Sequence, residues 1–479
     1  MPLMTGAQYI ESLKKVPIEV YALGERIPDR TEHPLFRPHI NAAAETYNLA
    51  HDAKLSQLGR ATSNLSGLEV NRFTHIHHST QDLVTKVKML RVLGQRTGSC
   101  FQRCVGFDGM NALYSITYDM DKAKGTKYHS RFRDYLKLVQ DNDLMPDGAM
   151  TDPKGDRSLA PSQQPDPDQY LHIVERRKDG VVIRGAKIHQ SGAVNSHEVI
   201  AMPTRALGPE DADYAIACAV PANSPGMLYI FGRQTNDTRK LEGGFDQGNA
   251  GYGLVGGEAT VIFDNVFVPW ERVFLAGEVE YAGPLVERFA AFHRQNYGGC
   301  KSGVADVVIG AAAALAEYQG VEKAPHVRDK LTEMMLLSET LHACSIACSS
   351  EGKPTPSGAY VVDYMLANVT KQNVTRYIYE IYRLAQDIAG GFLATMPSER
   401  DLRHPKIGPY VEKYYRGAGE VPAEYRMRLG RLLENMTCSI APVESMHGAG
   451  SPQAQRVMIL RQGDLEAKKR LAKKLAGLE

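Results

Sequence analysis

Short strand-like segments stand between two long helical regions, and this order restricts the fold more than any other feature of the chain. They cover residues 170–175, 181–183, 198–202, 214–220, 227–231 and 259–269, with turn residues between them. Because no long helical pattern falls among them, they predict an antiparallel β domain. We expect an α+β multidomain protein with an N-terminal helical domain over residues 1–143, a middle β domain over 144–278 and a C-terminal helical domain over 279–479.

The two flanking regions carry clear helical signals. Thr5 is placed to cap a helix, and Leu83, Val87, Leu90 and Leu93 recur at helical spacing. Residues 304–320 are apolar almost all round, which is typical of a helix buried in a core or at a subunit interface. With 479 residues the chain is also too long for one ordinary core.

Composition excludes several classes of protein. The chain is 43% hydrophobic and 23% charged, with a net charge of +1, so neither nucleic acid nor an anionic membrane is an expected partner. We expect no transmembrane segment, and the first residues lack the apolar core of a signal peptide. Seven cysteines, an odd number spread thinly, do not predict a disulfide framework. A reducing, cytoplasmic location fits best.

Two stretches supply soft metal ligands. In AFHRQNYGGCK, His293 precedes Cys300 by seven residues, which on a helix would separate them by about 10 Å along the axis. Gly298 and Gly299 permit a break and a close backbone approach that would relieve this distance. In GSCFQRCVG, Cys100 and Cys104 are four residues apart and would be neighbours on a helix.

Spacing alone leaves other interpretations open. Cys344 and Cys348 have the same spacing, and buried free cysteine is often only a small apolar side chain. His75, His77 and His78 offer another cluster of imidazoles, although such a cluster is usually a hydrogen-bonded loop. From the residues by themselves, a metal site at Cys100, Cys104, His293 and Cys300 is one hypothesis among these.

Three further segments, in this order along the chain, resemble the acyl-CoA dehydrogenase-like flavoproteins. GAKIHQSG (185–192) resembles the turn that lies against the flavin ring, and VIFDNVFVP (261–269) resembles the strand that closes the middle domain. QDIAGG (386–391) resembles the glycine turn that meets the FAD of a neighbouring subunit. This resemblance implies an acyl-CoA dehydrogenase-like fold, with an N-terminal helical domain, a middle antiparallel β-barrel domain and a C-terminal helical bundle.

A narrower resemblance runs over nearly the whole chain. GSCFQRCVG, AMTDPKGDR, FHRQNYGGCK and ESMHGAGSPQAQR resemble the 4-hydroxybutyryl-CoA dehydratase family. The related 4-hydroxyphenylacetate 3-monooxygenase oxygenase components share the flavin fold but lack the four metal-ligand positions. Residues 401–423 are the weakest part of the match, and we interpret them as a surface loop.

The resemblance implies a role for each matching residue. A 4Fe–4S cluster would be held by Cys100, Cys104, His293 and Cys300. The catalytic positions would be His293, as the base at C2, with Glu444, Tyr297, Lys301 and Glu258. FAD would be bound by Thr151, Asp152, Lys154, His189, Gln190, Ser191, Gly390 and Gly391. Two alternatives stay open for the TDPKGD segment: it is a plain turn, or Lys154 serves the phosphates of CoA.

The implied function is the radical dehydration of 4-hydroxybutyryl-CoA to crotonyl-CoA, with isomerisation of vinylacetyl-CoA to crotonyl-CoA. The implied enzyme is an oxygen-sensitive, cytoplasmic homotetramer that binds a CoA thioester. Two other functions fit part of the pattern. One is a flavin-dependent aromatic monooxygenase on the same fold, and the other is a non-catalytic protein whose thiolates hold structural zinc.

Overall fold

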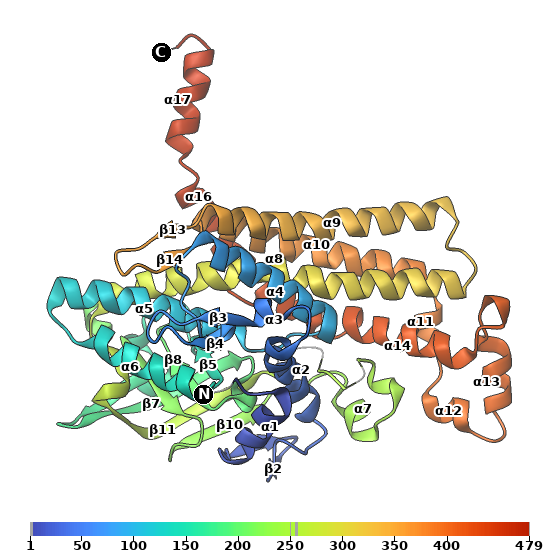
Figure 1. Cartoon of the computed structure of the whole chain (residues 1–479), viewed down its shortest axis with the longest axis horizontal. Helices are drawn as coiled ribbons and strands as arrows, with labels where there is room; N and C mark the ends of the chain where they lie inside the picture. The colour runs from blue at the N-terminus through green and yellow to red at the C-terminus, as the bar shows by residue number, and fades with distance from the viewer. Residues whose placement is uncertain (1–2, 250, 254–256, 479) are drawn as a thin grey trace.

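The structure, a computed structural model, describes residues 3–249, 251–253 and 257–478. Long helices lie side by side along one face of the molecule, and the main β sheets lie below them (Figure 1). Helices from the N-terminal part of the chain lie between these two layers (Figure 1). The expected order of helical, β and helical regions is therefore observed, and the protein belongs to the α+β class.

The N-terminal region forms helices where the apolar periodicity predicts them. Its helices are α1 (Gly6–Lys14), α2 (Arg37–Asn48), α3 (Ser56–Gly59), α4 (Thr80–Thr97), α5 (Cys104–Lys124) and α6 (Tyr128–Asp141). The hydroxyl of Thr5 accepts a hydrogen bond from the backbone of Gln8, so the predicted cap of α1 is confirmed. The periodic apolar residues of α4, from Leu83 to Leu93, are buried as expected.

Two main sheets occupy the middle of the chain. The six-stranded sheet has the order β2 (Glu25–Ile27), β1 (Val20–Ala22), β10 (Met227–Phe231), β11 (Ala259–Pro269), β7 (Gly180–Gln190) and β6 (His172–Arg176). The four-stranded sheet has the order β12 (Val273–Ala276), β9 (Ile216–Pro221), β8 (Glu198–Ala201) and β5 (Pro146–Ala149). Two small hairpins, β3 (Arg60–Thr62) with β4 (Glu69–Asn71) and β13 (Lys353–Pro354) with β14 (Tyr360–Val361), complete the described strands.

The expected antiparallel barrel is wrong in two respects. The described strands form separate open sheets, since β2 and β6 are left at the two edges of the larger sheet. The pairs β1–β10 and β5–β8 are parallel, so each main sheet is mixed. The physical reason is that β1 and β5 precede the strands they join by a long stretch of chain and add at positions that no hairpin dictates.

The C-terminal region is a helical bundle built on one 40-residue helix, α8 (Val279–Tyr318). Its other main helices are α9 (Pro325–Ser350), α10 (Tyr364–Ala389), α14 (Ala423–Cys438), α15 (Ala441–His447), α16 (Pro452–Gln462) and α17 (Leu465–Leu475). Among the described helices, α8 is the one long and apolar enough to cross a membrane, but 61% of that apolar window is buried within the protein. This burial is what a core helix requires and agrees with the prediction for residues 304–320.

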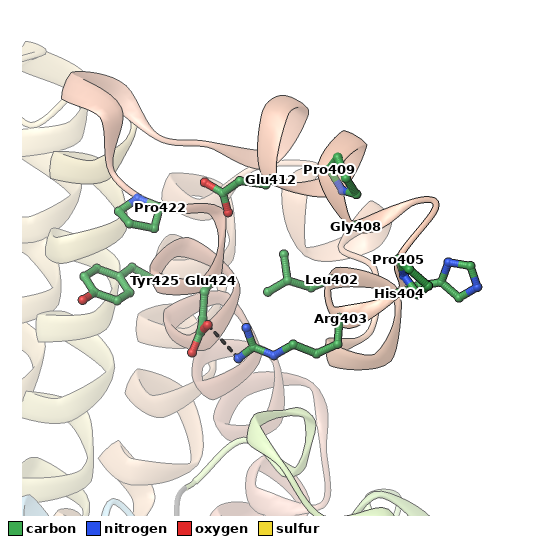
Figure 2. A pocket seen from close by; sticks show the side chains of 10 residues that line it. All are labelled: Leu402, Arg403, His404, Pro405, Gly408, Pro409, Glu412, Pro422, Glu424 and Tyr425. Carbon is green, nitrogen blue, oxygen red and sulfur yellow. Dashed lines mark hydrogen bonds and ion pairs between the residues drawn. The ribbon is translucent and has the colours of Figure 1, made fainter.

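The segment 401–423 is ordered differently from the prediction. It was expected as a surface loop, but the chain forms α12 (Glu399–Arg403) and α13 (Gly408–Tyr415), next to the short α11 (Phe392–Thr395). Tyr410 and Tyr414 on α13 are exposed, so the segment does lie at the surface. Arg403 and Glu424 join this segment to α14 through an ion pair of 2.7 Å (Figure 2).

Apolar packing connects the regions. One continuous core includes Tyr9 and Phe132 from the N-terminal helices together with Val199 and Val261 from the two sheets. A second core lies within the C-terminal bundle. The domain boundaries at residues 143/144 and 278/279 stay predictions, although the second falls next to the start of α8.

Candidate active site

Helix α8 carries half of the predicted catalytic and metal-binding residues on one stretch. His293, Tyr297 and the adjacent pair Cys300 and Lys301 follow one another at intervals of about one helical turn, so their side chains project from neighbouring parts of its surface. The rings of His293 and Tyr297 meet edge to face with centroids 5.7 Å apart. The sequence therefore places an imidazole, a phenol, a thiol and an ammonium group along a single rigid element.

The glycines of this stretch serve close packing and do not break the helix. Residues 298 and 299 lie inside the continuous α8, so the expected break is wrong. A Cβ atom at Gly298 would come within 2.5 Å of the Leu341 carbonyl oxygen, and one at Gly299 within 2.8 Å of that of Val87. The expected close approach is thus confirmed: α9 and α4 pack against α8 at a distance that only glycine allows.

The three predicted thiol ligands lie near one another. Cys100 lies in the connection between α4 and α5, Cys104 is the first residue of α5, and Cys300 comes from α8. Burial raises the pKa of each thiol, for Cys300 to about 11, and each of Cys100 and Cys104 is affected further by the neighbouring cysteines. A bare thiolate is therefore unfavourable here, whereas a bound metal ion supplies the positive charge that stabilises it.

The His293 ring is held by groups from α4, α5 and α8. Its Nδ1 atom lies 2.8 Å from Asp108 Oδ2, an oxygen that also accepts a 2.5 Å hydrogen bond from the Asn296 amide. Asp108 Oδ1 accepts a 2.6 Å bond from the Lys86 ammonium group. Both side chains of the Lys86–Asp108 ion pair are fully buried.

Glu444 completes the site from α15. The Tyr297 hydroxyl donates to Glu444 Oε1 at 2.6 Å, and the Lys301 ammonium forms an ion pair with Oε2. Burial by itself would raise the pKa of Glu444, but Lys301 and Tyr297 reverse this and hold the pKa below its usual range. The structure therefore brings Glu444, Tyr297 and Lys301 into direct contact, while their catalytic roles stay predictions.

Glu258 lies on the side of the β sheet. The Ser191 hydroxyl donates to its Oε1 at 2.8 Å, and the Gln234 amide lies 3.3 Å from its Oε2. Burial raises the pKa of Glu258 despite the Ser191 bond, and the charge of Glu444 acts in the same direction. The two predicted catalytic carboxyl groups are thus electrostatic neighbours with opposite shifts.

Most of the predicted flavin residues form one surface. Thr151 accepts a 2.8 Å bond from the Ile188 backbone through its carbonyl, which fixes the 151–157 loop against the end of β7. His189 lies near Lys154 and His447, because burial and, to a smaller extent, the electrostatic effect of these two side chains lower its pKa. Gln190 and Ser191 follow it directly, so the loop, the end of β7 and α15 meet.

Three predicted flavin residues lie elsewhere. Asp152 is buried and pairs with Lys187 at 2.8 Å, which makes it part of the support of the loop. Gly390 and Gly391, at the end of α10, are exposed, and a Cβ atom on either would meet no described atom within 4 Å. The single chain does not bring these glycines to the other site residues.

Besides Asp108, sequence reasoning missed two residues of the site. Lys371 on α10 is buried with its Nζ 4.0 Å from the centroid of the Tyr297 ring, and it donates to the carbonyls of Ser445 and Met446. Gln102 donates to the Cys100 carbonyl at 2.9 Å and bonds to Asn195 on the sheet side. The position of Gln102 between two cysteines was a usable signal, whereas nothing near Lys371 in the sequence marks it.

The competing cysteine pair is separate from this site. Cys348 on α9 donates to the Asp363 carbonyl at 3.4 Å, and Cys344 lies 3.7 Å from the Asn373 amide. Among the residues that the structure describes, no group of three or more His, Cys, Asp or Glu could hold a single metal ion. A structural zinc ion needs its ligands around one point, whereas the ligands of a 4Fe–4S cluster bind different iron atoms. Donors that do not surround one point are therefore compatible with a cluster, whose presence stays a prediction.

Two surface pockets lie away from this group. One, of about 440 Å³, is formed by the α12–α13 segment and the start of α14 and includes Arg403, Glu412 and Tyr425 (Figure 2). The other, of about 580 Å³, lies by the β3–β4 hairpin and includes Arg72, His75 and Asp82. Neither contains a predicted site residue.

Comparison with known proteins agrees with the geometry. Family models described as the N-terminal and C-terminal parts of 4-hydroxyphenylacetate 3-hydroxylase match residues 5–275 and 282–477. The chain is 55% identical over 491 residues to the 4-hydroxybutyryl-CoA dehydratase/vinylacetyl-CoA-Δ-isomerase of Clostridium aminobutyricum, with 100% of both covered.

Two solved structures are similar throughout. An oxygen-tolerant archaeal 4-hydroxybutyryl-CoA dehydratase from N. maritimus is 52% identical with a TM-score of 0.98, covering 100% of this chain and 96% of that one. The oxygenase component of 4-hydroxyphenylacetate 3-monooxygenase, complexed with FAD, is 26% identical with a TM-score of 0.84, covering 98% of each chain. The chain therefore belongs to the 4-hydroxyphenylacetate 3-hydroxylase family and, within it, to the group of the 4-hydroxybutyryl-CoA dehydratases.

Proposed function

We propose that the protein dehydrates 4-hydroxybutyryl-CoA to crotonyl-CoA and isomerises vinylacetyl-CoA to the same product. The observation that carries this proposal is that three thiols lie beside the Tyr297–Glu444–Lys301 group, with the His293 ring in contact with Tyr297. The full-length similarity to a relative that bears both activities in its name supports it.

The residues present fit two bound groups. FAD, supported by the family and by the FAD complex of a relative, would lie against Thr151, Lys154, His189, Gln190 and Ser191. A 4Fe–4S cluster would be held by Cys100, Cys104, Cys300 and His293. When bound, the flavin supplies one-electron redox chemistry and the cluster supplies a Lewis-acidic iron.

The reaction explains why a base and a proton donor are needed together. The thioester acidifies the hydrogens at C2, and the imidazole of His293 can accept that proton through Nε2. Nδ1 contacts Asp108 at 2.8 Å, so Nε2 is the nitrogen left to accept the C2 proton. The assignment gives His293 the base role and makes it a cluster ligand as well.

The other polar residues hold and move protons at the leaving hydroxyl and the carbonyl. Tyr297 can donate its proton while Lys301 and Glu444 balance the charge beside it. Glu258, whose pKa is raised by burial, can keep a proton closer to neutral pH than an exposed carboxyl group. These assignments stay proposals for each residue.

A second function is favoured by the family models, which are described by an aromatic hydroxylase. A flavin-dependent monooxygenase on this fold would need FAD but no iron. The paired thiols of Cys100 and Cys104, next to Cys300, have no task in that reaction. We therefore rank it second.

One anaerobic preparation separates these functions. We expect stoichiometric flavin and about four irons per chain, a broad cluster absorbance beneath the flavin bands, and crotonyl-CoA formed from 4-hydroxybutyryl-CoA. Flavin without iron, together with hydroxylation of 4-hydroxyphenylacetate once reduced flavin and dioxygen are supplied, would instead establish the monooxygenase. Neither cofactor, with one zinc ion per chain, would establish a structural protein.

The assembly and location follow as parts of the same proposal. Gly390 and Gly391 are exposed at the end of α10, where a second copy of the chain could place its FAD, as expected for a homotetramer. The protein would act in the cytoplasm on a CoA thioester. Sensitivity to oxygen stays a prediction, because the similar protein from N. maritimus is described as oxygen tolerant.

A further inference from the structure

One buried carboxylate connects the three helices around the site. Asp108 lies on α5, one turn after Cys104. Its Oδ2 atom contacts His293 and Asn296 of α8, and its Oδ1 atom accepts a hydrogen bond from Lys86 of α4. We propose that Asp108 is a positioning residue that holds the His293 imidazole with Nε2 directed to the thiol ligands. This inference rests on the proposed function of that site.

The bonds at Asp108 fix the tautomer of the imidazole. Lys86 forms a fully buried ion pair with Asp108, so the carboxylate acts only as an acceptor. The proton in the 2.8 Å contact must then belong to His293 Nδ1, which leaves the lone pair on Nε2. A histidine that binds a metal through one nitrogen commonly donates its other N–H to a carboxylate in this way.

The carboxylate itself has little freedom to turn. Oδ2 accepts from both Asn296 and His293, and Oδ1 accepts from Lys86, so rotation would break bonds to all of them. The Lys86 ammonium is fixed in turn by the Gln295 amide oxygen at 3.2 Å and lies 5.2 Å from the centroid of the Phe107 ring. Lys86, Gln295, Asn296 and Phe107 are buried, and the His293 side chain is 13% exposed.

The His293–Asp108 pair and two of the cysteines lie on the same two helices. The helices that bear the orienting pair are the helices that bear two of the three cysteines, since Asp108 and Cys104 share α5, and His293 and Cys300 share α8. The bond at Nδ1 does not depend on what occupies Nε2. The ring therefore keeps its position whether or not Nε2 is bound to iron, which is what a residue with two tasks requires.

The test must separate positioning from simple charge balance, because removing one partner of a buried ion pair destabilises a protein by itself. We would compare Asp108→Glu with the paired change Lys86→Met/Asp108→Asn, which removes both charges. The matched control is Arg272→Met/Glu198→Gln, which removes the partly buried 2.6 Å ion pair between Glu198 on β8 and Arg272. Each protein would be loaded with iron, sulfide and FAD under anaerobic conditions. We would then measure its iron content, kcat and KM, and the electron–nuclear coupling between the reduced cluster and the imidazole nitrogen.

We expect both Asp108 variants to fold and to keep most of their iron, with an altered or lost imidazole nitrogen coupling. We expect kcat to fall by about 10–100-fold with KM little changed, as for other residues that orient a metal ligand. The control should keep the wild-type coupling and kcat. Wild-type coupling and kcat in either Asp108 variant would overturn the inference, and the glutamate variant decides if the paired variant fails to fold. Absence of iron or of dehydration in the wild-type protein would instead refute the proposed function.

Discussion

Lys371 Nζ lies 4.0 Å from the centroid of the Tyr297 ring, where burial lowers the pKa of this amine to about 7. The same nitrogen donates to the carbonyls of Ser445 and Met446 in the last turn of α15. These bonds satisfy carbonyl groups at the end of the helix that carries Glu444 and fix its position. Lys371 thus links the two hydrogen-bonded residues, Tyr297 and Glu444, from a third helix.

Substituting Lys371 by methionine keeps the length of the side chain and removes these bonds. We expect the dehydration rate to fall by about 10–100-fold, because small displacements of positioned groups are costly, while iron and flavin contents stay near wild type. Activity and cofactor content measured on the same preparation check this. Lys469→Met on the exposed α17 is the control, and equal rates for the two variants would contradict the positioning role.

Asp147 on β5 gives a prediction about pH. It is fully buried with no ion pair or side-chain hydrogen bond among the described residues, and burial raises its pKa to about 7 against a weak backbone contact from Gly148. The folded state therefore binds this proton more tightly than the unfolded chain. Its contribution to stability is greatest below about pH 4 and is lost as the pH rises toward 7.

Asp147→Asn should accordingly raise the free energy of unfolding at pH 8, by about 1–3 kcal/mol, and change it little at pH 4. Denaturant unfolding at the two pH values measures the difference. Asp156→Asn, at an exposed carboxylate, serves as the control. An effect of equal size at both pH values would mean that the titration of Asp147 is not the cause.

Gly448 leaves room for the Tyr297 hydroxyl. A Cβ atom at this position would lie 1.7 Å from the Tyr297 oxygen, although the backbone conformation itself (φ −57°, ψ 142°) permits alanine. Gly448→Ala should displace the hydroxyl, destabilise the protein by about 1–3 kcal/mol and abolish most activity. In a Tyr297→Phe background the loss of stability should be smaller, since the clashing oxygen is gone. Equal losses in the two backgrounds would argue against this contact.

Six of the ten strands in the two main sheets were predicted from the sequence, although β7 runs to Gln190, beyond the expected 181–183. β10 and β11 begin and end where the apolar alternation and turn residues indicate. The parallel neighbours of β10 and β8 were not predicted, because a pairing between distant segments leaves no local pattern. The continuity of α8 was also missed, since glycine permits a helix break but does not require one when neighbouring helices need the space.

The candidate site was predicted where its residues have unusual chemistry. Cysteines, His293 and Glu444 stand out in a sequence by type and by family resemblance. Asp108 and Lys371 do not, because an aspartate or a lysine inside an amphipathic helix is most often a surface residue. Only the packing of α4, α5, α8 and α10 shows that these two charges are buried beside the site.

The two cysteine pairs with equal spacing allow a matched test of the ligand assignment. Cys300→Ser should lose most of the cluster iron, because a hydroxyl is a poor replacement for a thiolate. Cys344→Ala should keep it, since Cys344 lies on α9 beside Asn373 and away from the other thiols. Iron and acid-labile sulfide are measured on both variants. The same iron content in the two would remove Cys300 from the ligand set.

His293 has two proposed tasks, cluster ligand and base at C2, and replacement by cysteine separates them. A thiolate is the commoner ligand of such clusters, so His293→Cys should keep its iron. It should still be severely impaired, because a firmly bound thiolate provides no free base and no longer reaches Asp108 as Nδ1 does at 2.8 Å.

The discriminating measurement is the exchange of the C2 hydrogen of a substrate analogue with deuterated water, followed alongside dehydration in a variant whose iron content has been verified. We expect both to be lost together, since the variant lacks the imidazole nitrogen proposed to accept the C2 proton. Exchange at the wild-type rate, with dehydration lost, would assign the base to another group. Tyr297 and Glu444, joined by a 2.6 Å hydrogen bond near His293, would then be the pair to test next, because no proton can leave C2 without an acceptor within reach.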